Sequence, residues 1–165
     1  MARKPVLWML VGVPGSGKST FVENQIVNMD KYYIASTDRL IEIYASMRGA
    51  TYNDVFKENI GYAEKAMMTH IKDAIMYNYD IIWDQTNTSR KSRARKLKVI
   101  PDYYEKTCVF FPTPDDGELD RRLATRPGKT IPPYIINGMI ELLEYPKLDE
   151  GFDHIIEFDE GMLYA

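Results

Sequence analysis

A glycine-rich segment near the start of the chain constrains the fold more than any other feature. Residues 12–19 are Gly-Val-Pro-Gly-Ser-Gly-Lys-Ser, which matches the pattern Gly, any four residues, Gly-Lys, then Ser or Thr. An apolar run, VLWMLV at 6–11, leads directly into this segment, and a helix-compatible run, STFVENQIV, follows it. A strand, a tight loop and a helix in immediate succession indicate the first unit of a parallel α/β sheet.

The residue types in this segment are those that bind nucleoside phosphates. Glycines let backbone amides approach phosphate oxygens closely, and the following helix directs its positive end at the anion. Lys18 supplies a charge for the β and γ phosphates, and the Ser19 hydroxyl is a ligand for Mg²⁺. The predicted ATP-binding residues here are Gly12, Pro14, Gly15, Ser16, Gly17, Lys18, Ser19 and Thr20. The alternative is a glycine-rich turn with an accidental lysine.

Apolar, β-branched runs alternate with helix-period segments along the rest of the chain. The expected strands are 6–11, 32–36, 80–84, 106–111 and 154–158. The longest helix is expected at 53–77, where apolar residues recur at steps of three and four: Phe56, Ile60, Ala63, Met67, Ile71 and Ala74. We therefore expect one domain over residues 1–165, an α/β fold with a parallel sheet of about five strands flanked by helices.

Prolines mark the later helices. Pro127 is expected to end one helix after Arg126, and Pro132 and Pro133 to begin the next, which runs to about Glu144. Residues 127–133 are then a short loop between two helices, and 145–153 a loop into the last strand.

Composition excludes several classes of protein. The 165 residues are 45% apolar and 27% charged, which is typical of a folded domain and not of a disordered chain. The single cysteine, Cys108, cannot form an internal disulfide, and it predicts a reducing, cytoplasmic setting, the host cytoplasm for a viral protein. Because no apolar run approaches the roughly 20 residues that span a bilayer, we expect no membrane association.

A phosphate-binding loop alone does not separate a motor, a GTPase and a kinase. The chain is short for the extra modules of most motors, and it contains no Asn-Lys-x-Asp stretch to recognise guanine. Phosphoryl transfer to a small or terminal acceptor is therefore the leading class.

Polar residues at two further strand ends provide candidate acceptor-side groups. A kinase needs a carboxylate beside the acceptor hydroxyl, and Asp38 follows the strand YYIAS. The alternative is that Asp38 or Thr37 only caps the next helix. The third strand ends in Asp84-Gln85-Thr86-Asn87, where a carboxylate can hold Mg²⁺ through water and Thr86 and Asn87 can bind a substrate phosphate. The alternative is that Thr86, Asn87 or Thr88 caps the following helix.

Two groups of basic residues complete the pattern. Residues 89–98, SRKSRARKLK, hold six Lys or Arg and no acid, although the whole chain carries a formal charge of −3. An apolar stripe that docks this helix on the rest of the protein is expected at Ala94, Leu97 and Ile100. A different face carries Lys91, Arg95 and Lys98. This basic face is expected to contact a polyanionic substrate, and the alternative is that it is ordinary solvated surface.

The second basic group, Arg122 and Arg126, lies four residues apart near a helix end. Such a pair projects from one face and can reach bound phosphates as part of a lid. The alternative is that both are solvated arginines at a helix C-terminus.

Taken together, GVPGSGKST, the STD and DQTN strand ends and the segment RRLATRPGKTIP resemble the kinase domain of bacteriophage polynucleotide 5′-hydroxyl kinases. The resemblance covers nearly the whole chain, although only the glycine-rich loop is individually specific. It implies an adenylate-kinase-like P-loop fold with a helical lid, and transfer of the γ-phosphate of ATP to a 5′-OH end of DNA or RNA with Mg²⁺.

The resemblance also implies roles for individual residues. Lys18, Asp38 as the general base and Arg126 would be catalytic, Arg122 and Arg126 would bind ATP from the lid, and Ser19 and Asp84 would hold the metal. Thr86 would contact the phosphate of the acceptor strand. The full predicted acceptor site is Asp38, Arg39, Gln85, Thr86, Asn87, Lys91 and Arg95. Family members commonly carry an arginine three residues after the base, where this chain has Ile41, and its nearest arginine is Arg39.

Partners and other functions stay open. Some relatives carry a phosphatase domain after the kinase, whereas this sequence ends at Ala165, so a separate phosphatase or ligase is expected, and a homo-oligomer is an open alternative. A kinase of a sugar or nucleotide-sugar is the second function, and the basic segment 89–98 argues against it. A non-catalytic nucleotide-binding module is the third, and the joint presence of Lys18, Ser19, Asp38 and Arg126 argues against that.

Overall fold

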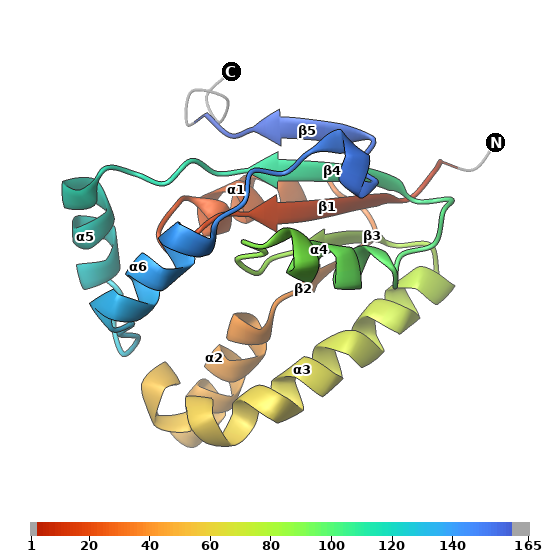
Figure 1. The fold of residues 1–165 in the computed structure, drawn as a ribbon. Coiled ribbons are helices and arrows are strands. Elements are labelled where there is room, and N and C mark those ends of the chain that lie inside the picture. Colours follow the sequence, from red (N-terminus) through yellow and green to blue (C-terminus); the bar gives the residue numbers. More distant parts are fainter. Residues whose placement is uncertain (1–2, 160–165) are drawn as a thin grey trace.

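The computed structural model describes residues 3–159, in which each strand is followed by one or two α-helices until the last strand (Figure 1). The strands are β1 (Val6–Val11), β2 (Tyr32–Ala35), β3 (Asp80–Trp83), β4 (Glu105–Phe110) and β5 (His154–Glu157). The helices are α1 (Lys18–Ile26), α2 (Thr37–Arg48), α3 (Tyr52–Met76), α4 (Arg90–Leu97), α5 (Asp116–Ala124) and α6 (Pro133–Leu142), with a short 3₁₀ helix, η1, at Leu148–Glu150.

All five strands are parallel and lie in the order β2-β3-β1-β4-β5. The central strand, β1, places Leu7 opposite Ile81 of β3 and Lys106 of β4. The expected parallel α/β sheet is confirmed, and each strand differs from its expected limits by at most one residue at either end. Since parallel strands end at one edge, the loops after β1, β2 and β3 meet there.

The longest helix, α3, begins with a capping box. Thr51 Oγ1 accepts the N–H of Asp54, and the Asp54 carboxylate accepts the N–H of Thr51. The expected buried stripe is present from Ala63 onward, but Val55 is buried instead of Phe56, which is 39% exposed. The reason is that the first turns of α3 pack on α2 and only the later turns pack on the sheet.

The basic helix α4 differs from expectation in its buried face. Arg93 is fully buried, and its Nε and Nη2 donate to the Glu150 carboxylate at 2.8 and 3.1 Å. Its Nη1 donates to the carbonyls of Asn87 and Thr88, both at 3.0 Å. Of the expected docking stripe, Ile100 is buried in the core and Leu97 packs against it, whereas Ala94 is exposed, so that part of the expectation is wrong. The buried ion pair and the two carbonyls hold α4 in addition to these apolar contacts.

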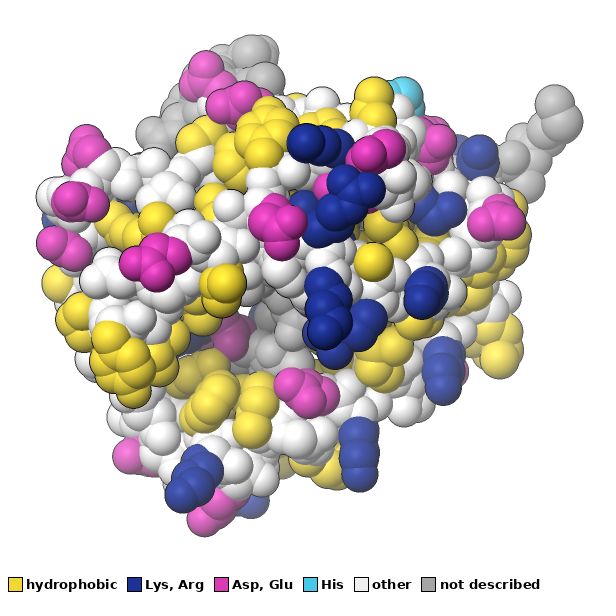
Figure 2. All heavy atoms as spheres, in the orientation of Figure 1, with side chains coloured by type: hydrophobic (Ala, Val, Ile, Leu, Met, Phe, Trp, Pro, Cys, Tyr) yellow, Lys and Arg dark blue, Asp and Glu magenta, His cyan; other side chains and the backbone are white. Residues whose placement is uncertain are grey.

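Apart from Lys96, which is half-buried and donates to Asn87 Oδ1, the remaining cations of residues 89–98 lie at the surface. Ser89 Oγ caps the helix by accepting the N–H of Ser92, so none of residues 86–88 caps it. Lys91, Arg95 and Lys98 are exposed. Figure 2 shows Lys and Arg side chains gathered over the α4 region, beside a hollow that opens between α6 and α2.

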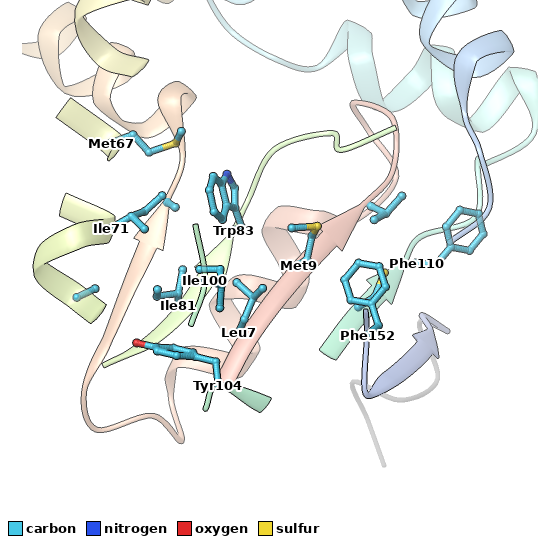
Figure 3. Close-up of a cluster of buried hydrophobic side chains, with 14 residues drawn as sticks. Leu7, Met9, Met67, Ile71, Ile81, Trp83, Ile100, Tyr104, Phe110 and Phe152 are labelled. Atoms are coloured by element: carbon cyan, nitrogen blue, oxygen red, sulfur yellow. The ribbon is translucent and has the colours of Figure 1, made fainter. Parts of the chain in front are cut away.

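Successive side chains of β1 point to opposite faces of the sheet and pack into two separate hydrophobic cores. Leu7 and Met9 are buried on the side covered by α3 and α4, together with Ile71, Trp83 and Tyr104 (Figure 3). Trp8 and Leu10 face the other side, where Val22 of α1 packs. Cys108 of β4 lies in the first core and is fully buried. Among the described helices, none has both the length and the apolar character to cross a membrane.

Candidate active site

The glycine-rich loop between β1 and α1 adopts a conformation that requires its glycines. Gly15 and Gly17 have φ values of 84° and 108°, where side chains cause strain. A Cβ at Gly12 would lie 2.5 Å from Ser16 Oγ and 2.9 Å from Phe111 Cβ. Helix α1 has no side-chain cap and no acid in its first turn. Its first backbone amides are therefore available to an anion.

Lys18 is folded back onto this loop. Its Nζ donates to the carbonyls of Gly12 at 2.8 Å and Val13 at 2.9 Å. Burial lowers the pKa of Lys18 to about 8, and the nearby Asp84 carboxylate opposes that shift. A phosphate group would satisfy this ammonium better than two carbonyls, because it brings a full negative charge.

A cavity of about 730 Å³ joins the loop to the ends of β2 and β3 and to the lid. It brings together most of the predicted site residues: Pro14, Gly15, Gly17, Lys18, Ser19, Thr20, Asp38, Arg39, Asp84, Gln85, Thr86, Arg122 and Arg126. Gly12 is buried beneath the loop, and Ser16 lines a neighbouring cavity of about 640 Å³. Lys91 and Arg95 lie outside both cavities, on the exposed surface of α4.

Asp38 lies in the first turn of α2 but does not cap it. Ser36 Oγ accepts the N–H of Arg39 and is the cap, so the capping alternative for Asp38 is wrong. Asp38 Oδ1 accepts the Tyr52 hydroxyl and Oδ2 accepts Lys129 Nζ, both at 2.7 Å. Burial raises the pKa of Asp38, but Lys129, Tyr52 and Arg126 together outweigh burial and lower it. The carboxylate is therefore ionised near neutral pH.

The end of β3 provides the other carboxylate of the cavity. Asp84 N donates to the carbonyl of Ala35 at 2.8 Å, which fixes the strand end against β2. Burial raises the pKa of Asp84, and Lys18 and Arg39 oppose the shift. Asp84 and the Ser19 hydroxyl line the same cavity and are hard oxygen ligands. This donor set fits Mg²⁺, which is usually bound by one or two carboxylates, waters and the phosphates of a substrate.

Gln85 and Thr86, which follow Asp84, make different contacts: Gln85 bonds to protein side chains, and Thr86 connects the β3 end to the glycine-rich loop and to the cavity. Gln85 bridges protein groups, because its Oε1 accepts Trp83 Nε1 at 3.0 Å and its Nε2 donates to Thr37 Oγ1 at 3.2 Å. The carbonyl of Thr86 accepts the N–H of Gly12 at 3.0 Å, which ties the β3 end to the glycine-rich loop. The Thr86 side chain lines the cavity.

Asn87 does not have the environment of the substrate ligand that the sequence predicted, because its side chain is buried and bonded to the protein. It is 2% exposed, has a φ of 49°, and its Nδ2 donates to the carbonyl of Leu10 at 2.7 Å. Its Oδ1 accepts Lys96 Nζ. A buried side chain with these partners stabilises the loop after β3, since its amide bonds to backbone carbonyls around the loop.

The lid consists of α5, the loop 125–132 and α6. Helix α5 ends at Ala124, so Arg126 lies in the loop and not on the helix face expected for it. Arg122 Nη1 donates to the carbonyl of Gly15 at 3.1 Å, and its Nε donates to Glu118 at 2.8 Å. Arg126 Nη1 is buried and lacks a hydrogen-bond partner within residues 3–159. Both arginines line the cavity beside the glycine-rich loop.

Sequence reasoning missed Lys129 and Tyr52. Lys129 is 10% exposed, pairs with Asp38, and lies 4.4 Å from the centre of the Tyr52 ring. The sequence offered one local clue to each residue. Lys129 follows Gly128 in the basic lid segment. Tyr52 follows Thr51, the first residue of the Thr51-x-x-Asp54 capping box of α3. Neither clue specifies that the two residues meet at Asp38, 91 residues from Lys129 in the sequence.

Solved structures with this fold include nucleic-acid and sugar kinases. A chain of the Pnkp1/Rnl/Hen1 RNA repair complex is 26% identical, with a TM-score of 0.67, over 93% of this chain and 48% of that one. This chain therefore spans about half the length of that relative. A gluconokinase from Sinorhizobium meliloti 1021 is 19% identical, with a TM-score of 0.54, over 96% of this chain and 84% of its own. A fungal RNA kinase is 12% identical, with a TM-score of 0.60, over 96% and 76%.

The family comparison agrees with the geometry of the site. A family described as an AAA domain matches residues 7–141, which include the glycine-rich loop, Asp38, Asp84 and the lid. That match covers most of the sequence. The chain belongs to this AAA domain family, and its fold is that of the P-loop kinases.

Proposed function

We propose that the protein is an ATP-dependent polynucleotide kinase that transfers the γ-phosphate of ATP to the 5′-OH end of DNA or RNA. One observation carries the proposal: a single cavity is lined both by the glycine-rich loop with Lys18 and by Asp38, the pKa of which is lowered. Asp38 remains 50% exposed, so a hydroxyl can reach it. This is the arrangement that in-line phosphoryl transfer needs.

The residues divide the reaction between them. The amides of the glycine-rich loop and Lys18 bind the ATP phosphates, and Arg122 and Arg126 neutralise charge on the transferring group from the lid. Asp38 accepts the proton of the acceptor hydroxyl as the hydroxyl oxygen bonds to the γ-phosphorus and the bridging oxygen leaves with ADP. Ser19 and Asp84 would hold Mg²⁺, which neutralises the β- and γ-phosphate oxygens when bound.

A polynucleotide acceptor is supported by charge outside the cavity. Lys91, Arg95 and Lys98 are exposed on α4, the helix that follows the β3 end. A strand whose 5′ end enters the cavity has further phosphates that can lie along such a surface. The likeness to a chain of an RNA repair complex and the bacteriophage kinase resemblance of the motifs support the same acceptor.

A small-metabolite kinase is the second candidate. The cavity, at about 730 Å³, lies within the usual range for small-molecule sites, and a gluconokinase shares the fold. A metabolite acceptor gives the exposed cations of α4 no role, which is why we place this function second.

Transfer of labelled γ-phosphate from ATP with Mg²⁺ tests the proposal. A 5′-OH oligonucleotide, DNA or RNA, should accept label, and the same oligonucleotide carrying a 5′-phosphate should not. Gluconate, other sugars and nucleosides form the comparison panel.

Lys18→Ala should abolish transfer and leave the fold intact, because the Lys18 ammonium bonds only to loop carbonyls within residues 3–159. Label in a sugar but not in the oligonucleotide would establish the second candidate, and an active, folded Lys18→Ala protein would remove both.

A further inference from the structure

The carboxylate of Asp38 is held from two sides by residues that no motif predicted. Tyr52 Oη, from the first residue of α3, donates to Oδ1, and Lys129 Nζ, from the lid loop, donates to Oδ2, each at 2.7 Å. The two donors also contact each other, because Lys129 Nζ lies 4.4 Å from the centre of the Tyr52 ring. Two donors on two oxygens define the orientation of a carboxylate.

The lid loop is fastened to the same turn of α3 that carries Tyr52. Asn53 N donates to the carbonyl of Gly128 at 3.1 Å, and Thr130 N donates to Asn53 Oδ1 at 3.2 Å. These bonds lie on either side of Lys129 and bring it to Asp38. Gly128 has a φ of 68°, and a Cβ there would lie 2.9 Å from the Thr51 side chain, so the close approach requires glycine.

One loop thus carries cations for both sides of the reaction. Arg126 lines the cavity and its Nη1 lacks a partner within the described residues, whereas Lys129, three residues later, is committed to Asp38. Arg126, Lys18 and Asp84 also interact with Asp38, and in the part of the chain that the structure describes they do so through charge alone. Lys129 and Tyr52 are therefore the groups that orient the carboxylate.

We propose that Lys129 and Tyr52 form a clamp that positions Asp38, and that this clamp exists only while the lid loop lies on α3. Both residues are positioning residues, since they act through Asp38. The proposal rests on the proposed function for the role of Asp38 as base. It adds that closure of the lid over the donor phosphates also prepares the acceptor side, so that the base is correctly oriented only when Arg126 is in place.

Lys129→Met tests the clamp, because methionine is also a long unbranched side chain but removes the ammonium that bonds to Asp38. We expect kcat to fall about 10- to 100-fold, with the KM for ATP within about threefold of wild type. Lys129→Arg should recover much of the loss, and Tyr52→Phe should lower kcat less than Lys129→Met. Lys72→Met, on the exposed face of α3, is the matched control and should be silent.

A double-mutant cycle separates positioning from other roles. In an Asp38→Asn background, Lys129→Met should lower kcat by less than threefold, since its effect passes through the carboxylate. An equal loss in both backgrounds would mean that Lys129 acts directly on substrate, and would overturn the clamp.

The same cycle is measured by urea unfolding, which needs no substrate. Asp38→Asn and Lys129→Met should be non-additive in unfolding if the clamp exists, and additivity would overturn it. If wild type labels no oligonucleotide, the proposed function fails, and the unfolding cycle still decides on the clamp.

Discussion

The two sides of the cavity are built in opposite ways. The proposed donor side centres on one contiguous segment, residues 12–20, where glycines with positive φ leave backbone amides available to an anion. The acceptor side gathers Asp38, Tyr52, Thr86 and Lys129 from separate segments of the chain. Local conformation therefore forms the loop at the centre of the donor side, to which the lid adds Arg122 and Arg126, whereas long-range packing must form the whole acceptor side.

This difference indicates which side can vary between relatives. A contiguous loop tolerates changes elsewhere in the fold, because its shape depends on its own φ and ψ angles. An assembled site changes whenever α3, the β3 end or the lid loop shifts. The fold is shared by a chain of an RNA repair complex and a gluconokinase, and a shared fold does not by itself define the acceptor.

The largest effect is expected from the acceptor carboxylate. Asp38→Asn keeps the size of the side chain but cannot accept the hydroxyl proton, so kcat should fall by about 10² to 10⁴. The thermal midpoint should change little, because Ser36 and not Asp38 caps α2. Asp73→Asn, exposed on α3, is the control. An Asp38→Asn enzyme within threefold of wild type at saturating ATP and acceptor would direct attention to Asp84 as the base.

Breaking the buried ion pair between Arg93 of α4 and Glu150 is expected to affect kcat less than Asp38→Asn, but to lower the stability of the whole fold. Arg93→Met leaves the Glu150 carboxylate buried without its partner and should lower the free energy of unfolding by about 3–5 kcal/mol. It also frees the carbonyls of Asn87 and Thr88, so the KM for the acceptor should rise more than the KM for ATP.

Urea unfolding and steady-state kinetics check both parts of this prediction. Arg95→Met, exposed on the same helix, should stay within about 0.5 kcal/mol of wild type. Equal increases in the two KM values would show that α4 supports the donor side as much as the acceptor side.

The smallest effect is expected at the surface of α4. Replacing Lys91, Arg95 and Lys98 with alanine should raise the KM for an oligonucleotide severalfold and leave that for ATP nearly unchanged. The slope of log affinity against log salt should weaken by about 0.7 for each phosphate that the variant no longer neutralises. A triple variant at Lys57, Lys65 and Lys72 of α3 removes the same charge elsewhere. Identical behaviour of the two triple variants would make the α4 cations ordinary solvated surface.

The sequence was sufficient to predict the sheet and the donor loop, for a common physical reason. Strands of a buried parallel sheet are short apolar runs, and the glycine-rich loop depends on local dihedral angles. Both are properties of neighbouring residues. The expected limits of the strands therefore differ from the structure by at most one residue at each end.

Residues with long-range partners were harder to predict. The composition of α4 indicated a basic surface but not that Arg93 pairs with Glu150, 57 residues away, while Ala94 faces solvent. Asn87 looked like a substrate ligand because it follows a strand, but a left-handed backbone and a buried amide give it a structural role. Lys129 was missed, because only the fold brings this loop residue to Asp38.

The burial of Cys108 makes lid motion directly observable. Cys108 is the single cysteine of the sequence, its side chain is fully buried, and burial raises the pKa of its thiol to about 12. Maleimide reagents, which react with exposed thiolates, therefore leave it unmodified in the folded protein. A cysteine introduced at the exposed Ala124, at the end of α5, would then carry a fluorophore as a single label. Its emission would follow the opening and closing of the lid in real time as nucleotide and acceptor are added.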